Sequence, residues 1–478
     1  MARVSEHYQL NAEQPTLPFV DVELDSDTPL YVDPRALLLD DTDWGAECVS
    51  LVQDFFGHVL ACIRQGKHDR ARSLLAQLRE PNETRLGLSR GSPRGRALGD
   101  VSSRDVWEAL SQSQAVQTGM LTALEETVLM IPGISFDIVS DITTNLIRAP
   151  LITFTQGVCR EYGIPLLAAV DSGPLWDPAG KTWYSELVAL PVPSRKLLLV
   201  PKELVRRKQD YNVDDYFNNF VLEHLRSVEL NDPTSSLVHV LKTTGERRVT
   251  KKKLREKYGQ GKGVAIRVTE ENPQILEEYR RRKDQRARPA TSHQALAEYT
   301  ATRAPDWDGL LAAVLGTPPG REGAEDYHVA TRDLLAALFY PHLTQPRKEW
   351  EIHDGRKRID IVFTNVASVG FFSWVAQHYS APHVVVECKN YARDVANAEL
   401  DQLAGRFSPR RGRVGLLLSR SFENETTFAA RCRDTARDGR GFIVHLTDED
   451  LKALVDEARS SSYPGFRLLR DRFEALLS

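Results

Sequence analysis

The sequence HVVVECKNY, residues 383–391, decides the fold of the C-terminal third of this chain. Its apolar run ends abruptly in charge, which is typical of a strand that is buried on both faces inside an α/β sheet. Side chains alternate along a strand, so Glu387 and Lys389 are expected on one face and Cys388 on the other. The stretch therefore predicts a carboxylate and an ammonium side by side at the end of a central strand.

The segments on either side of this strand alternate between helix and strand. Upstream, GAEDYHVATRDLLAALFY (323–340) has apolar residues at helical spacing, and EWEIHDGRKRIDIVFTN (349–365) predicts a hairpin that turns at Asp354–Gly355. Downstream, helical patterns separate two further strands. The order αββ(α)βαβαβα predicts an α/β fold around a mixed sheet.

A second carboxylate belongs to the same neighbourhood. If the strand RIDIVF pairs beside 383–391, Asp360 can share the face of Glu387. Hard cations such as Mg²⁺ bind oxygen ligands, and phosphodiester hydrolysis uses such a cation to polarise the phosphate and activate water. We therefore expect Asp360, Glu387 and the backbone carbonyl of Cys388 to hold Mg²⁺ or Mn²⁺. Lys389 would orient or help to deprotonate the attacking water, because the pKa of a Lys falls readily when it is partly buried beside a metal.

This arrangement resembles a known nuclease superfamily. Asp360, a gap of 26 residues and then Glu-Cys-Lys at 387–389 are similar to the motif of the PD-(D/E)XK, restriction-endonuclease-like enzymes. The resemblance covers roughly residues 318–460 and implies an αβββαβ core with metal-dependent nuclease activity. The residue before Asp360 is Ile359 rather than the Pro of the motif, and no step of the chemistry depends on that Pro.

The same resemblance implies two further site residues. Members of the superfamily often carry another acidic residue on the helix before the hairpin, and Glu325 is the first choice for it, with Glu322 the second. A Gln on the helix after the central strand often completes the site, and Gln402 stands there. Glu325 could instead be an acidic residue at a helix start that the helix dipole favours, and Gln402 could instead be an ordinary surface residue.

The chain of 478 residues is long enough for several domains. Residues 1–165 predict a mainly helical N-terminal domain with short strands. Residues 166–290 predict a small α/β region that ends in basic segments. Residues 291–317, rich in Ala, Thr and Pro, predict a linker, and 318–478 the nuclease domain.

Composition limits the function classes. Apolar residues make up 41% of the chain and charged residues 27%, as in ordinary globular protein. No uninterrupted apolar run has the roughly 18 residues that a membrane span needs, and the N-terminal residues lack an apolar signal core, so a cytoplasmic protein with no membrane contact is expected. The five Cys residues have no zinc-site spacing.

The net charge of −4 means that any nucleic-acid contact must be local. Basic residues cluster in 242–262 and 280–288, just before the catalytic region, and again after the Gln402 helix. We expect these segments to flank the substrate path, although a solvated helix face or loop would have the same composition. The expected contact residues are Lys251, Lys252, Lys253, Arg280, Arg281, Arg282, Arg406, Arg410 and Arg411.

The sequence thus predicts a metal-dependent endonuclease with DNA as the first candidate substrate. A homo-oligomer is expected, because one such site cuts one strand. Nuclease domains of this type joined to a long N-terminal portion resemble prokaryotic restriction and anti-phage defence effectors. That resemblance implies a regulatory upstream region that answers to a phage-derived or protein trigger, or to a partner defence subunit. Two alternatives stay open: a nuclease that cleaves RNA, and a catalytically silent nucleic-acid-binding or assembly protein.

Overall fold

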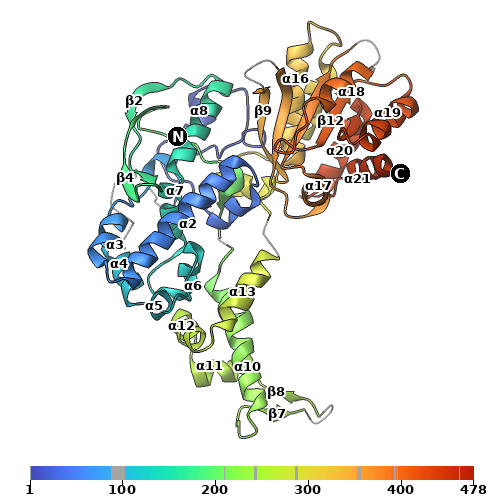
Figure 1. The fold of residues 1–478 in the computed structure, drawn as a ribbon. Coiled ribbons are helices and arrows are strands. Elements are labelled where there is room, and N and C mark those ends of the chain that lie inside the picture. Colours follow the sequence, from blue (N-terminus) through green and yellow to red (C-terminus); the bar gives the residue numbers. More distant parts are fainter. Residues whose placement is uncertain are drawn as a thin grey trace.

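The chain forms a helical N-terminal part, a protruding arm and a C-terminal sheet domain (Figure 1). The architecture is therefore the mixed α/β class that the sequence predicts. The structure is a computed structural model, which describes residues 2–87, 103–208, 210–241, 245–285, 289–352, 357–391, 395, 397–461 and 463–478.

The sheet domain contains one five-stranded sheet in the order β13-β12-β11-β10-β9. Strands β9, β10 and β11 pair antiparallel, whereas β11, β12 and β13 pair parallel. Its elements are α15 (Trp307–Gly316), α16 (Ala324–Phe339), β9 (Leu343–Ile352), β10 (Lys357–Asn365), α17 (Gly370–Tyr379), β11 (His383–Lys389), α18 (Asn397–Ala404), β12 (Val414–Ser419), α19 (Glu425–Arg437), β13 (Phe442–Leu446), α20 (Asp448–Ser460) and α21 (Arg467–Leu477).

Strand β11 is the buried central strand that its apolar run predicts, and all seven of its residues are buried. Helix α16 packs against β9 and β11, while α18 packs against β12 and β13. Strands β9 and β10 form the predicted hairpin arms, with Lys357 opposite Ile352. The Asp354–Gly355 turn predicted between them lies outside the described residues.

The N-terminal part is mainly helical and also contains small two-stranded sheets. Its buried apolar side chains form one core, whose members range in sequence from Val4 to Leu296. Residues from both predicted upstream regions therefore share this core. Among the described residues up to 165, the α-helices longer than five residues are α2 (Asp43–Arg64), α3 (His68–Leu75), α4 (Ser103–Gln112), α7 (Phe136–Leu146) and α8 (Arg148–Tyr162), and a 3₁₀ helix covers Pro34–Leu39. The paired strands are β1 (Tyr31–Val32) with β6 (Val205–Arg206), β2 (Leu167–Asp171) with β5 (Leu187–Leu190), and β3 (Leu175–Asp177) with β4 (Thr182–Tyr184).

Helix α2 is the longest helix among the described residues and the one with a length and composition that would allow it to span a membrane. It packs as a core helix in this structure. Phe55, Val59 and Ile63 lie on its buried face within the N-terminal core.

The arm projects from the N-terminal part, on the side away from the sheet domain (Figure 1). It is built from α9 (Val213–Tyr216), a π-helical turn (Phe217–Val221), α10 (Leu222–Asn231), β7 (His239–Val240), β8 (Arg247–Arg248), α11 (Lys251–Tyr258), α12 (Lys262–Glu271) and α13 (Gln274–Asp284).

The predicted linker 291–317 is more structured than its composition suggests. It contains α14 (His293–Thr300) and α15, and each helix anchors a different core. Leu296 is buried in the N-terminal core and Val314 in the core of the sheet domain. The segment therefore connects the two cores through helices that are each anchored by a buried apolar side chain.

Polar and aromatic contacts join the sheet domain to the N-terminal part. Arg332 of α16 pairs with Glu161 of α8 at 3.1 Å. Gln345 Nε2 of β9 donates to Glu203 Oε1 at 2.5 Å. The ammonium of Lys202, which is buried, lies 4.3 Å from the centre of the Tyr340 ring. These contacts hold α8 opposite β9.

Candidate active site

Two carboxylates meet at the end of the central strand, as the strand alternation predicts. Ile361 of β10 pairs with Val386 of β11, so the neighbouring residues Asp360 and Glu387 lie next to each other. Lys389 is two residues beyond Glu387 and shares its face. The antiparallel pairing of β10 with β11 therefore brings together residues that are far apart in the sequence.

Glu387 is the most buried member of this group, with no exposed surface. Its Oε1 atom accepts hydrogen bonds from Lys389 Nζ at 2.7 Å and from Gln402 Nε2 at 2.5 Å. Its Oε2 atom is buried and has no hydrogen-bond partner within the described part of the chain. Burial, and then the charge of Asp360, raise the pKa of Glu387. A carboxylate in this state favours an added cation.

The Glu387 carboxylate stabilises the protonated form of Lys389. Burial opposes the charged form, but the attraction and hydrogen bond of the Glu387 carboxylate outweigh it and raise the pKa of Lys389. The lowered pKa expected for Lys389 beside a bound metal stays a prediction. Lys389 is an ammonium at neutral pH, with its side chain only 8% exposed.

Asp360 reaches the backbone of the central strand. Its Oδ2 atom accepts a hydrogen bond from the Cys388 N–H at 2.8 Å. His328 Nε2 lies 3.8 Å from the same oxygen and 3.3 Å from the carbonyl oxygen of Cys388, in position to donate to it. The carbonyl expected as a metal ligand therefore already has a hydrogen-bonding neighbour.

His328 is the site residue that the sequence reasoning missed. It lies on α16, three residues after Glu325, and therefore on the same helix face. That spacing was the available signal. It becomes meaningful only when α16 is known to pack against β11.

Glu325 does not join the carboxylate pair. Its side chain is 66% exposed and forms an ion pair with Lys348 of β9. The hydrogen bond from Lys348 lowers the pKa of Glu325. The Glu325 carboxylate, which was expected near the metal, is thus paired with Lys348. The alternative, Glu322, is an exposed residue just before the helix.

The donor set fits a hard cation that keeps most of its water. Two carboxylates converge, and one buried oxygen of Glu387 lacks a hydrogen bond. Among the described residues, no three His, Cys, Asp or Glu side chains form a cluster that could enclose a metal. Mg²⁺ commonly binds through one or two carboxylates and completes its shell with water, so Asp360 and Glu387 suit it better than a zinc-type ion.

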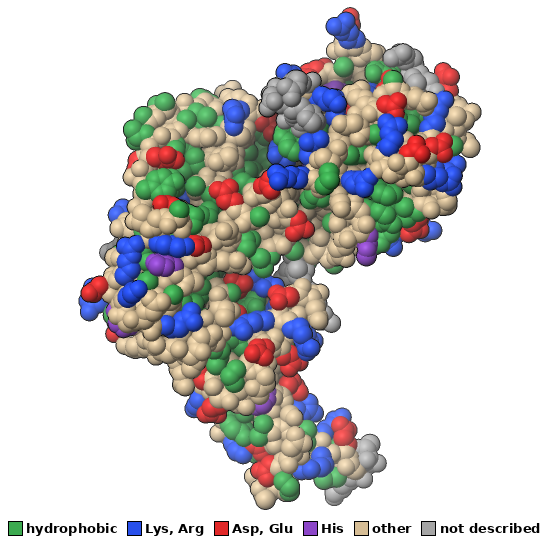
Figure 2. All heavy atoms as spheres, in the orientation of Figure 1, with side chains coloured by type: hydrophobic (Ala, Val, Ile, Leu, Met, Phe, Trp, Pro, Cys, Tyr) green, Lys and Arg blue, Asp and Glu red, His purple; other side chains and the backbone are tan. Residues whose placement is uncertain are grey.

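The predicted basic contacts at 251–253 and 280–282 lie on the arm rather than beside the sheet (Figure 1). Acidic side chains are interspersed with the basic ones on its visible face (Figure 2). Lys251, for example, pairs with Glu223 at 3.3 Å. The structure therefore places these segments on the arm and not beside Asp360 and Glu387, and their contact with a substrate stays a prediction.

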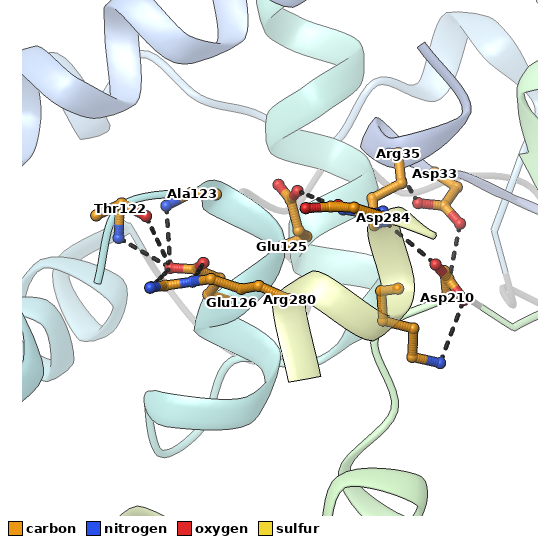
Figure 3. A network of polar contacts seen from close by, with 10 residues as sticks. Asp33, Arg35, Thr122, Ala123, Glu125, Glu126, Asp210, Arg280 and Asp284 are labelled. Atoms are coloured by element: carbon orange, nitrogen blue, oxygen red, sulfur yellow. Dashed lines mark hydrogen bonds and ion pairs between the residues drawn. The ribbon is translucent and has the colours of Figure 1, made fainter. Parts of the chain in front are cut away.

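Arg280 has a structural role instead. It forms an ion pair with Glu126, which is 2% exposed, and donates to the carbonyl of Met120 at 2.6 Å (Figure 3). Glu126 also accepts from the N–H groups of Thr122 and Ala123. Arg280 thereby fastens α13 to the N-terminal core. Arg281 and Arg282 are exposed on the same helix.

The three arginines after α18 lie closer to the site. The positive charge of Arg406 is near enough to lower the pKa of Glu387, against the larger effect of burial. Arg411 Nε donates to the Arg406 carbonyl at 2.9 Å. Arg410 is exposed, and Arg410 and Arg411 line a cleft between the sheet and the N-terminal part.

Comparisons with known proteins concern a limited part of the chain. Residues 9–212 match a family model described as "Domain of unknown function (DUF8370)". The chain is 24% identical over 147 residues to the "Putative transposon gamma-delta 80.3 kDa protein" of Escherichia coli (strain K12), a match that covers 30% of this chain and 21% of that protein. The chain thus spans about a fifth of the length of this curated relative. No solved structure matches the chain.

Proposed function

We propose that the protein is a metal-dependent endonuclease that hydrolyses phosphodiester bonds, with DNA as its substrate. One observation carries the proposal. Glu387 is fully buried, is hydrogen-bonded by Lys389 and Gln402, lies next to Asp360, and keeps one oxygen without a hydrogen bond. A carboxylate that only stabilised the fold would be expected to have both buried oxygens satisfied.

The chain's residues divide the work as follows. Asp360 and Glu387 would hold Mg²⁺ or Mn²⁺, which when bound supplies a polarised phosphate and activated water. Lys389 presents an ammonium that can stabilise negative charge on the phosphate or position water. Gln402 fixes the Glu387 carboxylate by donating to it. His328 positions the Cys388 peptide beside Asp360.

The wider setting is part of the same proposal. An unrestrained nuclease would damage its own cell, so the upstream residues would restrain or direct the site, as in prokaryotic restriction or anti-phage defence effectors. The junction between α8 and α16, fastened by Arg332 and Glu161, is the place where such control could reach the sheet domain. A phage-derived or protein trigger, or a partner subunit, would act there.

A cleavage assay tests the proposed activity. Purified protein is incubated with plasmid, linear duplex, single-stranded DNA and RNA, with Mg²⁺ or with a chelator. Glu387→Gln should abolish cleavage, because it removes the charge that binds the cation while preserving the side chain's size. The matched control is Glu449→Gln on α20, where the side chain is 79% exposed. Chelator-resistant cleavage, or full activity of Glu387→Gln, would contradict the proposal, and cleavage of RNA alone would change the substrate.

A further inference from the structure

A cleft of about 920 Å³ lies between the N-terminal part and the sheet domain. One wall is formed by α8 and the start of α2, and includes Trp44, Phe154 and Arg160. The other wall is formed by β9, parts of β10 and β11, and the loop after α18. Figure 2 shows Lys and Arg side chains gathered along the sheet domain where it borders the hollow between the two parts.

The cleft lies on the face of the sheet that also bears Asp360 and Glu387, and neither of these two residues lines it. Arg358 lines the cleft and lies two residues before Asp360 on β10, so the two side chains share a face. His383 lines it too, and shares the face of Glu387 on β11. At the usual rise per strand residue, the backbone of Arg358 is about 7 Å from that of Asp360. A strand that is longer than the cleft would have to extend about this distance along the same face to reach Asp360.

The cleft carries more positive charge than the domain junction needs. Arg160, Arg410 and Arg411 line it, and none of them forms an ion pair with a carboxylate in the described part of the chain. Arg347 is half-buried there, its Nε atom lacks a hydrogen-bond partner among the described residues, and its guanidinium lies 4.4 Å from the centre of the Trp350 ring. Unpaired arginines on both walls of one cleft favour an anionic ligand such as a phosphate backbone.

Aromatic side chains accompany these charges. The Trp44 and Phe154 rings lie 6.5 Å apart on the α-helical wall, and both are only partly buried. Cationic grooves with partly exposed aromatic rings are the usual means of binding single-stranded nucleic acid, because every base has a face that can stack. A double helix keeps its bases stacked inside and offers these rings nothing comparable.

We propose that this cleft binds a single strand of nucleic acid and delivers it to Asp360 and Glu387, so that the N-terminal part supplies one wall of the substrate path. The inference deepens the proposed nuclease function and rests on it for the direction of the strand toward the carboxylates. The site would then act on single-stranded segments, such as flaps or unwound ends.

Binding without cleavage tests the inference. Fluorescence anisotropy is measured with labelled oligothymidylate and with a duplex of equal length, on the full chain in the presence of a chelator. Arg410→Gln/Arg411→Gln should weaken single-strand binding about 10-fold or more. It should also lower the slope of log affinity against log salt by about 1.4, at roughly 0.7 per phosphate contact. The control is Lys452→Gln/Arg467→Gln, on α20 and α21, two residues that do not line the cleft.

Two single variants examine the other wall. Arg160→Gln, an exposed change that does not threaten folding, should weaken single-strand binding and lower the salt slope by about half as much as the double variant. Phe154→Ala should weaken binding roughly 5- to 100-fold without changing the salt slope, because it removes stacking and no charge. Circular dichroism confirms that the Phe154→Ala protein remains folded.

The outcomes separate the inference from the proposed function. If the wild type cleaves DNA but the cleft variants bind oligothymidylate as tightly as the control, the inference is wrong and the nuclease proposal stands. If the cleft variants lose binding while the wild type cleaves nothing, the cleft assignment stands and the proposed function fails. Tighter binding of the duplex through the same residues would overturn the choice of a single strand.

Discussion

Replacing Lys389 with Met offers a stability test of the buried pair that does not depend on the cleavage assay. Lys389 Nζ lies 2.7 Å from Glu387 Oε1, and the two side chains are 8% and 0% exposed. Lys389→Met leaves the Glu387 carboxylate buried beside Asp360, with Gln402 as its one hydrogen-bond donor within the described residues. Removing one partner of a buried ion pair typically costs about 3–5 kcal/mol, because the remaining charge is uncompensated.

The companion variants turn this cost into a cycle. Glu387→Gln should cost less, since the amide oxygen still accepts a hydrogen bond and Lys389 retains slight access to water. The double variant contains no uncompensated charge, so it should be more stable than Lys389→Met, with a coupling energy of about 2 kcal/mol. The exposed pair Lys452–Glu449 provides the control, because Lys452→Met should cost about 0.5 kcal/mol or less.

Protonation gives the same test a predictable pH dependence. Burial and Asp360 raise the pKa of Glu387, so in Lys389→Met the neutral carboxyl is favoured further. The cost of the substitution should be small at acidic pH, where Glu387 is neutral, and should grow as the pH rises through its raised pKa. Urea unfolding of the full chain in chelator, followed by tryptophan fluorescence at several pH values, measures it. Additive, pH-independent costs would refute the reasoning.

Three further predictions concern the metal, the domain junction and assembly. Asp360→Ala should lower Mg²⁺-dependent cleavage by a factor of about 10² or more while DNA binding survives, and replacement of Mg²⁺ by Ca²⁺ should permit binding without turnover; unchanged cleavage rates would contradict both. Burial raises the pKa of Glu203 to about 7. Because the charged form is disfavoured in the folded state, the chain loses stability as the pH rises from about 4.5 to 7. In thermal or urea unfolding, Glu203→Gln should therefore stabilise the chain by up to about 3 kcal/mol above pH 7 and hardly at all below pH 4.5. A double-strand break by a single-site enzyme needs two copies, so light scattering should detect a dimer or larger oligomer with DNA, and a strict monomer would refute this.

Much of the sheet domain could be predicted because its signals are local. The apolar run before Glu387 and the alternation of side chains depend on neighbouring residues, so they predict a buried strand that ends in a carboxylate and an ammonium. The helix containing Gln402 follows directly along the chain, and its contact with Glu387 agrees with the expectation. The helices within 291–317 could not be predicted, because Leu296 and Val314 find their buried partners in separate, distant cores.

The sequence by itself determined the order of strands and helices, the side of the strand that bears Glu387 and Lys389, and the nearness of Asp360 once its strand was assumed to pair beside residues 383–391. These follow from backbone geometry with a period of two residues. Only the tertiary structure decided that Lys348 pairs with Glu325, that His328 lies beside Asp360, and that the arm lies away from the site. It also brought α8 opposite β9 across the cleft. Such choices depend on packing between separate elements of the chain, for which a single sequence contains no local pattern.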